Sequence, residues 1–259
     1  MEVHLLLDVF TSQWLVIGLF FCIAILYSSV GFGGGSSYLA VLALIGLGFT
    51  EIRATALLCN ILVVSSNVFF YMKNNDYPWK KVLPLVLFSV PFAFIGGLLK
   101  INQMVFFVLL GFTLLFAAIT MWLSKKIAQS NTENNEIHFL KNSAYGSSIG
   151  FVSGMVGIGG GIFLAPLLHL SHWDTPKKIA ATASFFILVN SLAGLSGQLI
   201  NPDFYVDWNL TSILLITVFI GGQIGSRLSN KLFSAVQLKK ATAILIAFVS
   251  IRILIKYLF

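Results

Sequence analysis

Two glycine clusters of the form Val-Gly-x-Gly-Gly-Gly are the residues of this sequence whose types and spacing are best suited to binding a ligand through the backbone. The first spans residues 30–35 and the second spans 156–161, an offset of 126 residues. Glycine lets the backbone approach a ligand closely, and the free N–H groups at a helix start attract anions. Because an apolar segment follows each cluster, the pattern predicts an anion site where two such helices begin.

Polar side chains in the next apolar segment of each half complete the candidate site. Asn60 and Asn190 are the preferred side-chain amides, because amides inside a membrane are costly and usually face the protein interior. The predicted binding residues are Gly31, Gly33, Gly34, Gly35, Ser36, Ser37, Asn60, Gly157, Gly159, Gly160, Gly161, Thr182 and Asn190. A second interpretation stays open, in which the glycines only permit close helix packing and the amides only join helices.

The distribution of acidic residues favours an anionic or neutral ligand. All nine Asp and Glu residues lie in predicted loops or at segment ends, so a cation site built on buried carboxylates is not expected. Neither glycine cluster is followed by Lys-Ser or Lys-Thr, which excludes a P-loop. There is no Cys-x-x-Cys, no His/Glu metal motif and no Ser/His/Asp grouping, so we expect no enzyme, metal or cofactor.

The elements that position these residues are membrane segments. The chain is 58% hydrophobic and 10% charged, with a mean hydropathy of +0.93, whereas soluble domains carry about 25% charged residues. A spanning helix needs about 20 apolar residues, so the segments 36–48, 143–155 and 162–170 are too short to span. The ten predicted segments are 13–30, 36–48, 53–72, 82–99, 104–123, 143–155, 162–170, 177–199, 209–226 and 238–258.

The two halves of the chain match beyond the glycine clusters. Residues 53–56 align with 180–183 at an offset of 127, and Ile95-Gly96 aligns with Ile224-Gly225. Internal repeats are usual in secondary transporters. We therefore expect a first repeat at 1–123, a linker at 124–142 and a second repeat at 143–259. Each repeat would hold a glycine-broken helical hairpin plus three spanning helices, giving about 8 to 10 membrane segments.

Loop charges predict that the two repeats are inverted. If each glycine-linked hairpin returns to its starting side, 12 of the 16 basic residues fall on one side; if it crosses once, they divide 8 to 8. The positive-inside rule prefers the first arrangement, with both termini outside, and assigns the net charge of +7 to loops rather than to nucleic-acid binding. Arg53 begins a segment on the predicted outer side, where we expect it to extend toward lipid headgroups.

Three stretches resemble the paired signatures of the TauE/SafE sulfite-exporter family of membrane transporters. They are Ser28–Gly35, Ser153–Pro166 and Ala180–Ser184. The resemblance implies a bacterial inner-membrane permease with about eight spanning helices that moves small anions, often sulfite or organosulfonates. Pro166 departs from the symmetry of the halves, because the first half has no proline at the corresponding place.

We therefore expect a secondary transporter or exporter of small sulfur oxyanions, working by alternating access around the two glycine breaks. A passive anion channel with the same site, and a structural membrane protein, are the alternatives. The expected partners are the anion and the lipid bilayer, and the oligomeric state is open between monomer and homodimer.

Overall fold

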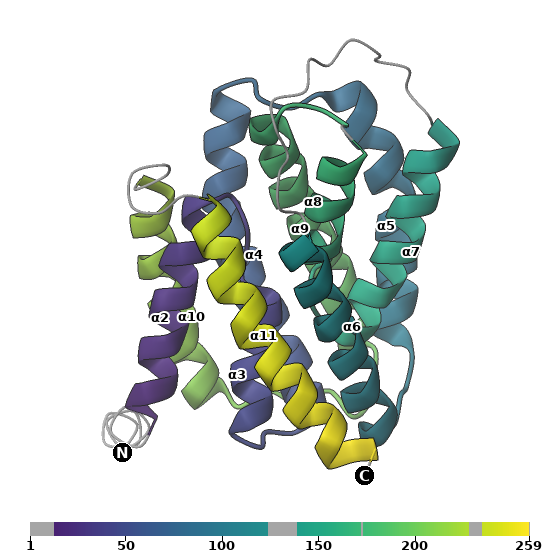
Figure 1. Ribbon diagram of the computed structural model, residues 1–259. Helices are drawn as coiled ribbons and strands as arrows, with labels where there is room; N and C mark the ends of the chain where they lie inside the picture. Colours follow the sequence, from purple (N-terminus) through teal and green to yellow (C-terminus); the bar gives the residue numbers. More distant parts are fainter. Residues whose placement is uncertain (1–12, 124–138, 172, 228–234, 259) are drawn as a thin grey trace.

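The structure, a computed structural model, describes residues 13–123, 139–171, 173–227 and 235–258. These residues form ten α-helices and no strand, which confirms the all-helical fold class (Figure 1). Among them, α4, α5, α6, α9 and α10 are long and apolar enough to cross a membrane, as expected for a polytopic membrane protein. Most of the predicted linker, residues 124–138, lies outside the described part of the chain.

The helices follow the predicted segments closely. In the first half they are α2 (Trp14–Ser29), α3 (Gly35–Leu44), α4 (Phe49–Lys73), α5 (Trp79–Leu98) and α6 (Gln103–Leu123). In the second half they are α7 (Phe139–Val156), α8 (Gly161–Leu170), α9 (Pro176–Leu199), α10 (Trp208–Arg227) and α11 (Ala235–Leu258). With ten residues each, α3 and α8 are too short to span, as the sequence indicates.

The segment predicted at 143–155 is longer than expected. Helix α7 has 18 residues and begins at Phe139, four residues before the predicted segment, but it is not among the described helices that are long and apolar enough to cross a membrane. Hydropathy falls at Lys141 and Asn142, but backbone hydrogen bonds continue through them. Asn142 is buried and accepts a hydrogen bond from Trp173 Nε1 at 3.3 Å, so packing against the loop before α9 supports the added turn.

Close helix contacts depend on rows of glycine. Gly146, Gly150 and Gly154 lie four residues apart on α7, and a Cβ at any of them would overlap the backbone carbonyl of Leu85, Ser89 or Ala93 on α5. Gly221 and Gly225 of α10 lie in the same way against α2, where their nearest backbone atoms are the carbonyl oxygens of Phe21 and Ile25. These small-residue faces are typical of helix pairs in membranes, where backbones must approach closely.

The strongest helix contacts join one half of the chain to the other. α5 packs on α7, α2 on α10, α4 on α9, and α6 on α11. The contact of α5 with α9 has a counterpart in that of α10 with α4, and the contact of α3 with α4 in that of α8 with α9. In Figure 1, α2 begins and α11 ends at the lower end of the bundle, whereas α7 begins at the upper end.

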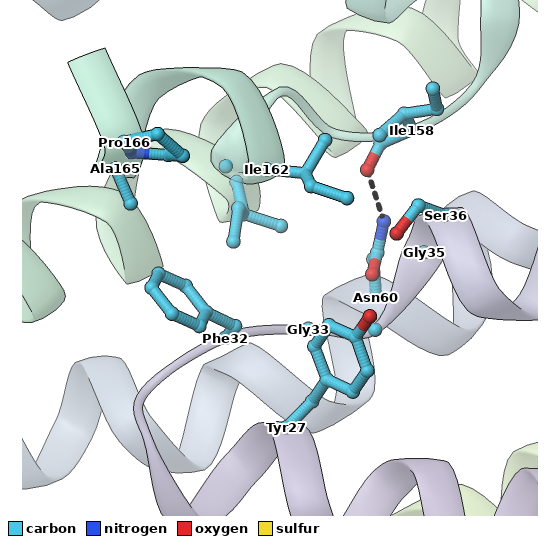
Figure 2. Close-up of a pocket in the computed structure, with 13 residues that line it drawn as sticks. Tyr27, Phe32, Gly33, Gly35, Ser36, Asn60, Ile158, Ile162, Ala165 and Pro166 are labelled. Carbon is cyan, nitrogen blue, oxygen red and sulfur yellow. Dashed lines mark hydrogen bonds between the residues drawn. The ribbon is translucent and has the colours of Figure 1, made fainter. Parts of the chain in front are cut away.

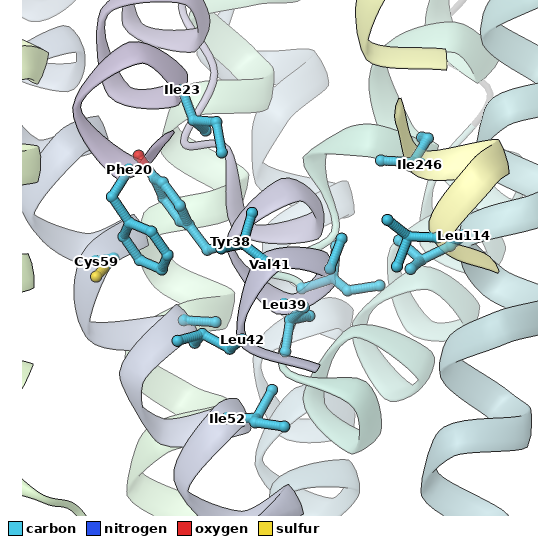
Figure 3. Packing of buried hydrophobic residues seen from close by; sticks show 14 of the residues in the cluster. Phe20, Ile23, Tyr38, Leu39, Val41, Leu42, Ile52, Cys59, Leu114 and Ile246 are labelled. Carbon is cyan, nitrogen blue, oxygen red and sulfur yellow. The ribbon is translucent and has the colours of Figure 1, made fainter. Parts of the chain in front are cut away.

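A large apolar cluster encloses the short helix α3. Tyr38 is fully buried and stacks on Phe20 of α2, with ring centroids 4.6 Å apart, and Leu39 and Leu42 are fully buried beside it (Figure 3). All residues of α3 from Gly35 to Leu42 are buried. Since α3 is too short to be stable alone, packing against the neighbouring helices holds it in place.

Ion pairs join the two halves of the chain where α5 and α9 begin. Lys81 of α5 binds Asp174 at 2.9 Å, and Lys177 of α9 binds Asp76 at 3.0 Å. Burial raises the pKa of Asp174, but hydrogen bonds from Lys81 and from the Thr175 backbone outweigh it, so the net shift is downward. The buried carboxylate therefore stays ionised and ties the loop before α9 to the start of α5.

Arg53 does not reach the lipid headgroups. Its side chain is buried, and Nη2 donates to the carbonyl oxygens of Gly154 at 3.2 Å and Gly97 at 3.4 Å. These carbonyls lie in the last turns of α7 and α5, where helices carry partial negative charge and lack partners of their own. The expectation of snorkelling was wrong, because two helix C-termini from different parts of the chain supply the counter-charge inside the protein.

Candidate functional site

Both glycine clusters interrupt the chain between two helices in the same way. α2 ends at Ser29 and α3 begins at Gly35, while α7 ends at Val156 and α8 begins at Gly161. The residue before each short helix is left-handed, with φ of +87° at Gly34 and +84° at Gly160. Only glycine adopts this conformation without strain. The left-handed backbone therefore explains why glycine stands at equivalent positions in both halves.

The two breaks meet at one pocket. It is small and partly open, and the residues that line it are Tyr27, Phe32, Gly33, Gly34, Gly35, Ser36, Asn60, Ile158, Gly161, Ile162, Ala165, Pro166 and Ile187. No charged side chain is among these described residues. Two helix N-termini, those of α3 and α8, open onto the same space, so the pocket combines free backbone N–H groups with a neutral lining.

Asn60 of α4 lies between the two breaks. Its Nδ2 donates to the carbonyl oxygen of Ile158 at 3.0 Å, which joins the first half to the second break (Figure 2). The side chain is fully buried, and Oδ1 accepts no hydrogen bond from the described residues. The Cα atoms of Gly33, Gly35 and Gly159 face this amide, and a Cβ on any of them would press on it. The glycines thus make room for one amide.

The start of α3 supplies the other polar groups of the pocket. Ser36 is 2% exposed, and its hydroxyl makes no hydrogen bond to the described residues. The N–H groups of Gly35 and Ser36 precede the first intrahelical bond, which runs from Ser37 N to Gly34 O at 2.9 Å. Tyr27 bonds Ser37 side chain to side chain at 2.8 Å, so the last turn of α2 holds the first turn of α3 in place.

The opposite wall of the pocket is apolar. Phe32 of the first break lies across from Ile162, Ala165 and Pro166 of α8, and these side chains surround the cavity in Figure 2. Ile187 of α9 closes the same side. A ligand in this pocket therefore meets hydrogen-bond donors and an amide at one end and hydrocarbon at the other.

Six of the predicted site residues line the pocket. They are Gly33, Gly34, Gly35, Ser36, Asn60 and Gly161. Ser37 and Gly159 lie behind this wall, where Ser37 bonds Tyr27 and Gly159 faces the Asn60 amide. Gly160 supports the second break through its left-handed conformation.

The other predicted residues lie away from the pocket lining. Gly31 packs against Tyr71 and Ala180, and Gly157 packs against Arg53. Thr182 bonds the Lys178 carbonyl within its own helix at 2.8 Å.

The Asn190 side chain also lies outside the pocket lining. Its Nδ2 donates to Ser89 Oγ of α5 at 3.0 Å and to the Phe186 carbonyl at 2.8 Å. It joins helices, which is the second role that the sequence leaves open for buried amides.

The pocket also uses residues that the sequence reasoning missed. Phe32 and Ile158 are the variable residues of the two Val-Gly-x-Gly-Gly-Gly patterns. Ile162, Ala165 and Pro166 have the i, i+3, i+4 spacing of one helix face, which is a signal that the sequence does contain. Tyr27 and Ile187 are apolar-segment residues with no local mark, and only helix packing brings them to the pocket.

Comparison with known proteins decides the family. Residues 16–253 match the family of sulfite exporters TauE/SafE. The chain belongs to the TauE/SafE family. A probable membrane transporter protein, y4hK, of Sinorhizobium fredii is 33% identical over 241 residues, covering 91% of this chain and 95% of its own. One from Methanocaldococcus jannaschii, MJ0441, is 26% identical over 82% and 84% of the two chains. No solved structure matches the sequence.

Membership in the TauE/SafE family makes this chain a multi-pass membrane transporter and not an enzyme. The family match covers both glycine breaks and the helices that follow them. The pocket between the breaks is then the candidate place for the transported molecule, because its lining is neutral and comes from both halves.

Proposed function

We propose that this TauE/SafE transporter is a secondary transporter of small anions, sulfur oxyanions such as sulfite or organosulfonates, and that it binds them between its two glycine breaks. The observation that carries the proposal is the meeting of two helix N-termini at one pocket without a carboxylate. Partial positive charge at both helix starts favours an anion. Discontinuous helices whose N-termini point at an anionic group are a recurring transporter design.

We further propose that the halves, 1–123 and 143–259, are inverted repeats joined by the linker 124–142, with both termini outside the inner membrane. The paired helix contacts support this proposal, since the packing of α5 on α7 and α9 has a counterpart in that of α10 on α2 and α4. The opposite starting ends of α2 and α7 also support it (Figure 1). Rocking of one repeat against the other would then open the pocket to each side in turn.

Flux measurements in proteoliposomes test the anion proposal. The purified full chain should move sulfite, methanesulfonate or thiosulfate with saturable kinetics, because one small binding site holds a limited number of ions at a time. Empty liposomes set the background rate. Absence of saturable flux for every anion would overturn the proposal, and a flux that rises linearly with concentration would identify a passive channel instead.

Asn60 provides a test of the pocket itself. Replacing Asn60 by leucine keeps the shape but leaves the Ile158 carbonyl without its donor, a loss of about 1–3 kcal/mol at the junction of the halves. We expect saturable anion flux per folded molecule to fall at least about tenfold, because the variant also removes a polar group from the pocket lining, and a hydrogen bond to a charged ligand contributes about 1.5–3 kcal/mol.

Asn190→Leu is the matched control for Asn60→Leu. It removes an equally buried amide whose partners, Ser89 and Phe186, lie outside the pocket lining. Its flux per folded molecule should stay within about twofold of wild type, even where its melting temperature falls by a similar amount. Equal loss of flux in both variants would mean that the Asn60 effect is one of stability and not of the pocket.

A further inference from the structure

Reciprocal ion pairs tie the two halves of the chain together where α5 and α9 begin, at the upper end of the bundle in Figure 1. The first half supplies Asp76, just before α5, and Lys81 in its first turn; the second half supplies Asp174, just before α9, and Lys177 in its first turn. Lys81 binds Asp174 at 2.9 Å, and Lys177 binds Asp76 at 3.0 Å. Each half therefore gives one lysine and one carboxylate to the other, and we call these four residues the ion-pair clasp.

One pair of the clasp is shielded from water. The side chains of Lys81 and Asp174 are 13% and 7% exposed. Lys81 also donates to the Trp173 carbonyl at 3.0 Å and lies over the Trp173 ring, and Lys178 adds a second ion pair to Asp174 at 3.4 Å. Exposed ion pairs contribute little, but removing one partner of a buried pair leaves an uncompensated charge. The Lys81–Asp174 pair is therefore the part of the clasp that most resists separation.

An aromatic layer lies between the ion-pair clasp and the first glycine break. Its residues are Tyr71 near the end of α4, Tyr77 and Trp79 at the start of α5, and Phe185 of α9. Phe185 comes from the second half, and its ring centroid lies 5.9 Å from that of Tyr77 and 5.3 Å from that of Trp79. On the side of the break, a Cβ on Gly31 would lie 2.8 Å from the Tyr71 hydroxyl. The layer therefore reaches from the clasp to the residue that precedes Phe32 of the pocket lining.

The connecting segments at the opposite end of the bundle carry a different charge pattern. There α4 and α10 begin, and the carboxylates of Glu51 and Asp207 repel each other. Glu51 aligns with Lys178 at the offset of 127 residues, so a carboxylate in the first half takes the place of a lysine that binds Asp174 in the second. Lys100 lies 3.8 Å from Asp203, but these side chains are 61% and 72% exposed. The charges of the connecting segments therefore favour closure at the end where α5 and α9 begin.

Two polar atoms oppose the closed arrangement of the clasp. Asp76 Oδ2 and the Tyr77 hydroxyl are buried and have no hydrogen-bond partner among the residues that the structure describes. A buried polar atom without a partner is destabilising, and water would satisfy both atoms once the segments separate. The ion pairs thus stabilise closure while these two atoms favour opening, as expected of a contact that must break and form again.

Resting on the proposed alternating access, we propose that the ion-pair clasp and the aromatic layer form the gate at this end of the transport path. The structure shows this gate closed. Both ion pairs of the clasp must separate, and Phe185 must leave Tyr77 and Trp79, before the pocket opens to this side. Because each of these contacts joins the first half to the second, one relative motion of the halves breaks them together.

Labelling of a thiol in the pocket tests the gate without any measurement of flux. Ser36→Cys, in a chain that also carries Cys22→Ser and Cys59→Ala, places one thiol in the pocket lining. Its rate of reaction with an anionic, membrane-impermeant methanethiosulfonate would be measured in intact cells and in inverted membrane vesicles, which present opposite ends of the protein. A separate Lys80→Cys protein, changed at an exposed residue beside the clasp, identifies the preparation in which the clasp faces the reagent.

Lys81→Met should speed labelling from the clasp side at least about tenfold and should not speed it from the other side, because it leaves the Asp174 carboxylate without its closest partner. Lys80→Met is the matched control, since Lys80 is exposed next to Lys81, and its rate should stay within about twofold.

A charge exchange at the second ion pair provides the rescue. Asp76→Lys and Lys177→Asp each place like charges together and should speed labelling from the clasp side about fivefold, whereas the double variant should return to within about twofold.

Faster labelling from both sides in Lys81→Met would mean that the clasp holds the whole fold together, and an unchanged rate from the clasp side would also overturn the gate. The expected labelling pattern in a protein that moves no anion would support the gate and refute the proposed substrate. Saturable anion flux with unchanged labelling would support the proposed function and refute the gate.

Discussion

Replacing Gly35 by alanine is expected to abolish anion flux, whereas the same change at Gly161 should leave most of it. The two residues occupy equivalent first positions of α3 and α8. A methyl group at Gly35 would press on the Asn60 amide and lie 2.7 Å from the Ile158 carbonyl oxygen, which is backbone and cannot move easily. At Gly161 the methyl meets mainly the flexible end of Ile187, with Cγ1 at 2.5 Å.

The expected difference is large because the Gly35 methyl breaks the contact between the halves. We expect flux per folded molecule to fall about a hundredfold or more in Gly35→Ala, corresponding to at least about 2.7 kcal/mol, and by no more than about threefold in Gly161→Ala. Proteoliposome flux normalised to the monodisperse protein fraction measures both. Gly18→Ala is the control for helix propensity, since a Cβ there meets nothing within 4 Å. Equal effects at Gly35 and Gly161 would show that the half-sites are interchangeable.

Replacing Arg53 by methionine should destabilise the protein more than Arg53→Lys or Arg252→Met. The variant leaves the Gly97 and Gly154 carbonyls at two helix ends without their donor and removes a charge that those ends stabilise. Losing one partner from a buried charged interaction costs about 3 kcal/mol. We expect the melting temperature in detergent to fall by roughly 6–12 °C.

Arg252→Met is the control for Arg53→Met, because Arg252 is exposed on α11 and should change stability by less than about 0.5 kcal/mol. Arg53→Lys keeps the charge but has a single donor head in place of the planar fork, so it should melt between the wild type and Arg53→Met. An Arg53→Met protein that melts at the wild-type temperature would rule out the capping role of Arg53.

The glycine breaks could be located from the sequence because their signal is local. Four glycines in six residues cost helix stability wherever they stand, so the helix ends at Ser29 and Val156 follow from composition alone. The apolar segments are similarly local, and ten of them became ten helices. The exception, α7, begins at Phe139 because hydropathy does not record buried polar residues such as Asn142.

The hydrogen-bond partners of each buried polar side chain could not be predicted, because they belong to neighbouring helices. Asn60 and Asn190 are both amides inside a long apolar segment, yet Asn60 meets the second glycine break and Asn190 meets Ser89 of α5. Arg53 looked like a residue at the lipid interface until the ends of α5 and α7 were found beside it.

The sequence by itself determined that the chain is an α-helical membrane protein with two matched glycine breaks and no carboxylate inside a predicted apolar segment, because hydropathy, glycine content and charge are properties of the individual residues. Only the tertiary structure decided that both breaks border one pocket, with a polar wall from α3 and α4 and an apolar wall from α8 and α9. That outcome depends on contacts between residues about a hundred positions apart, such as Asn60 and Ile158, and no local pattern encodes which helix faces pack together.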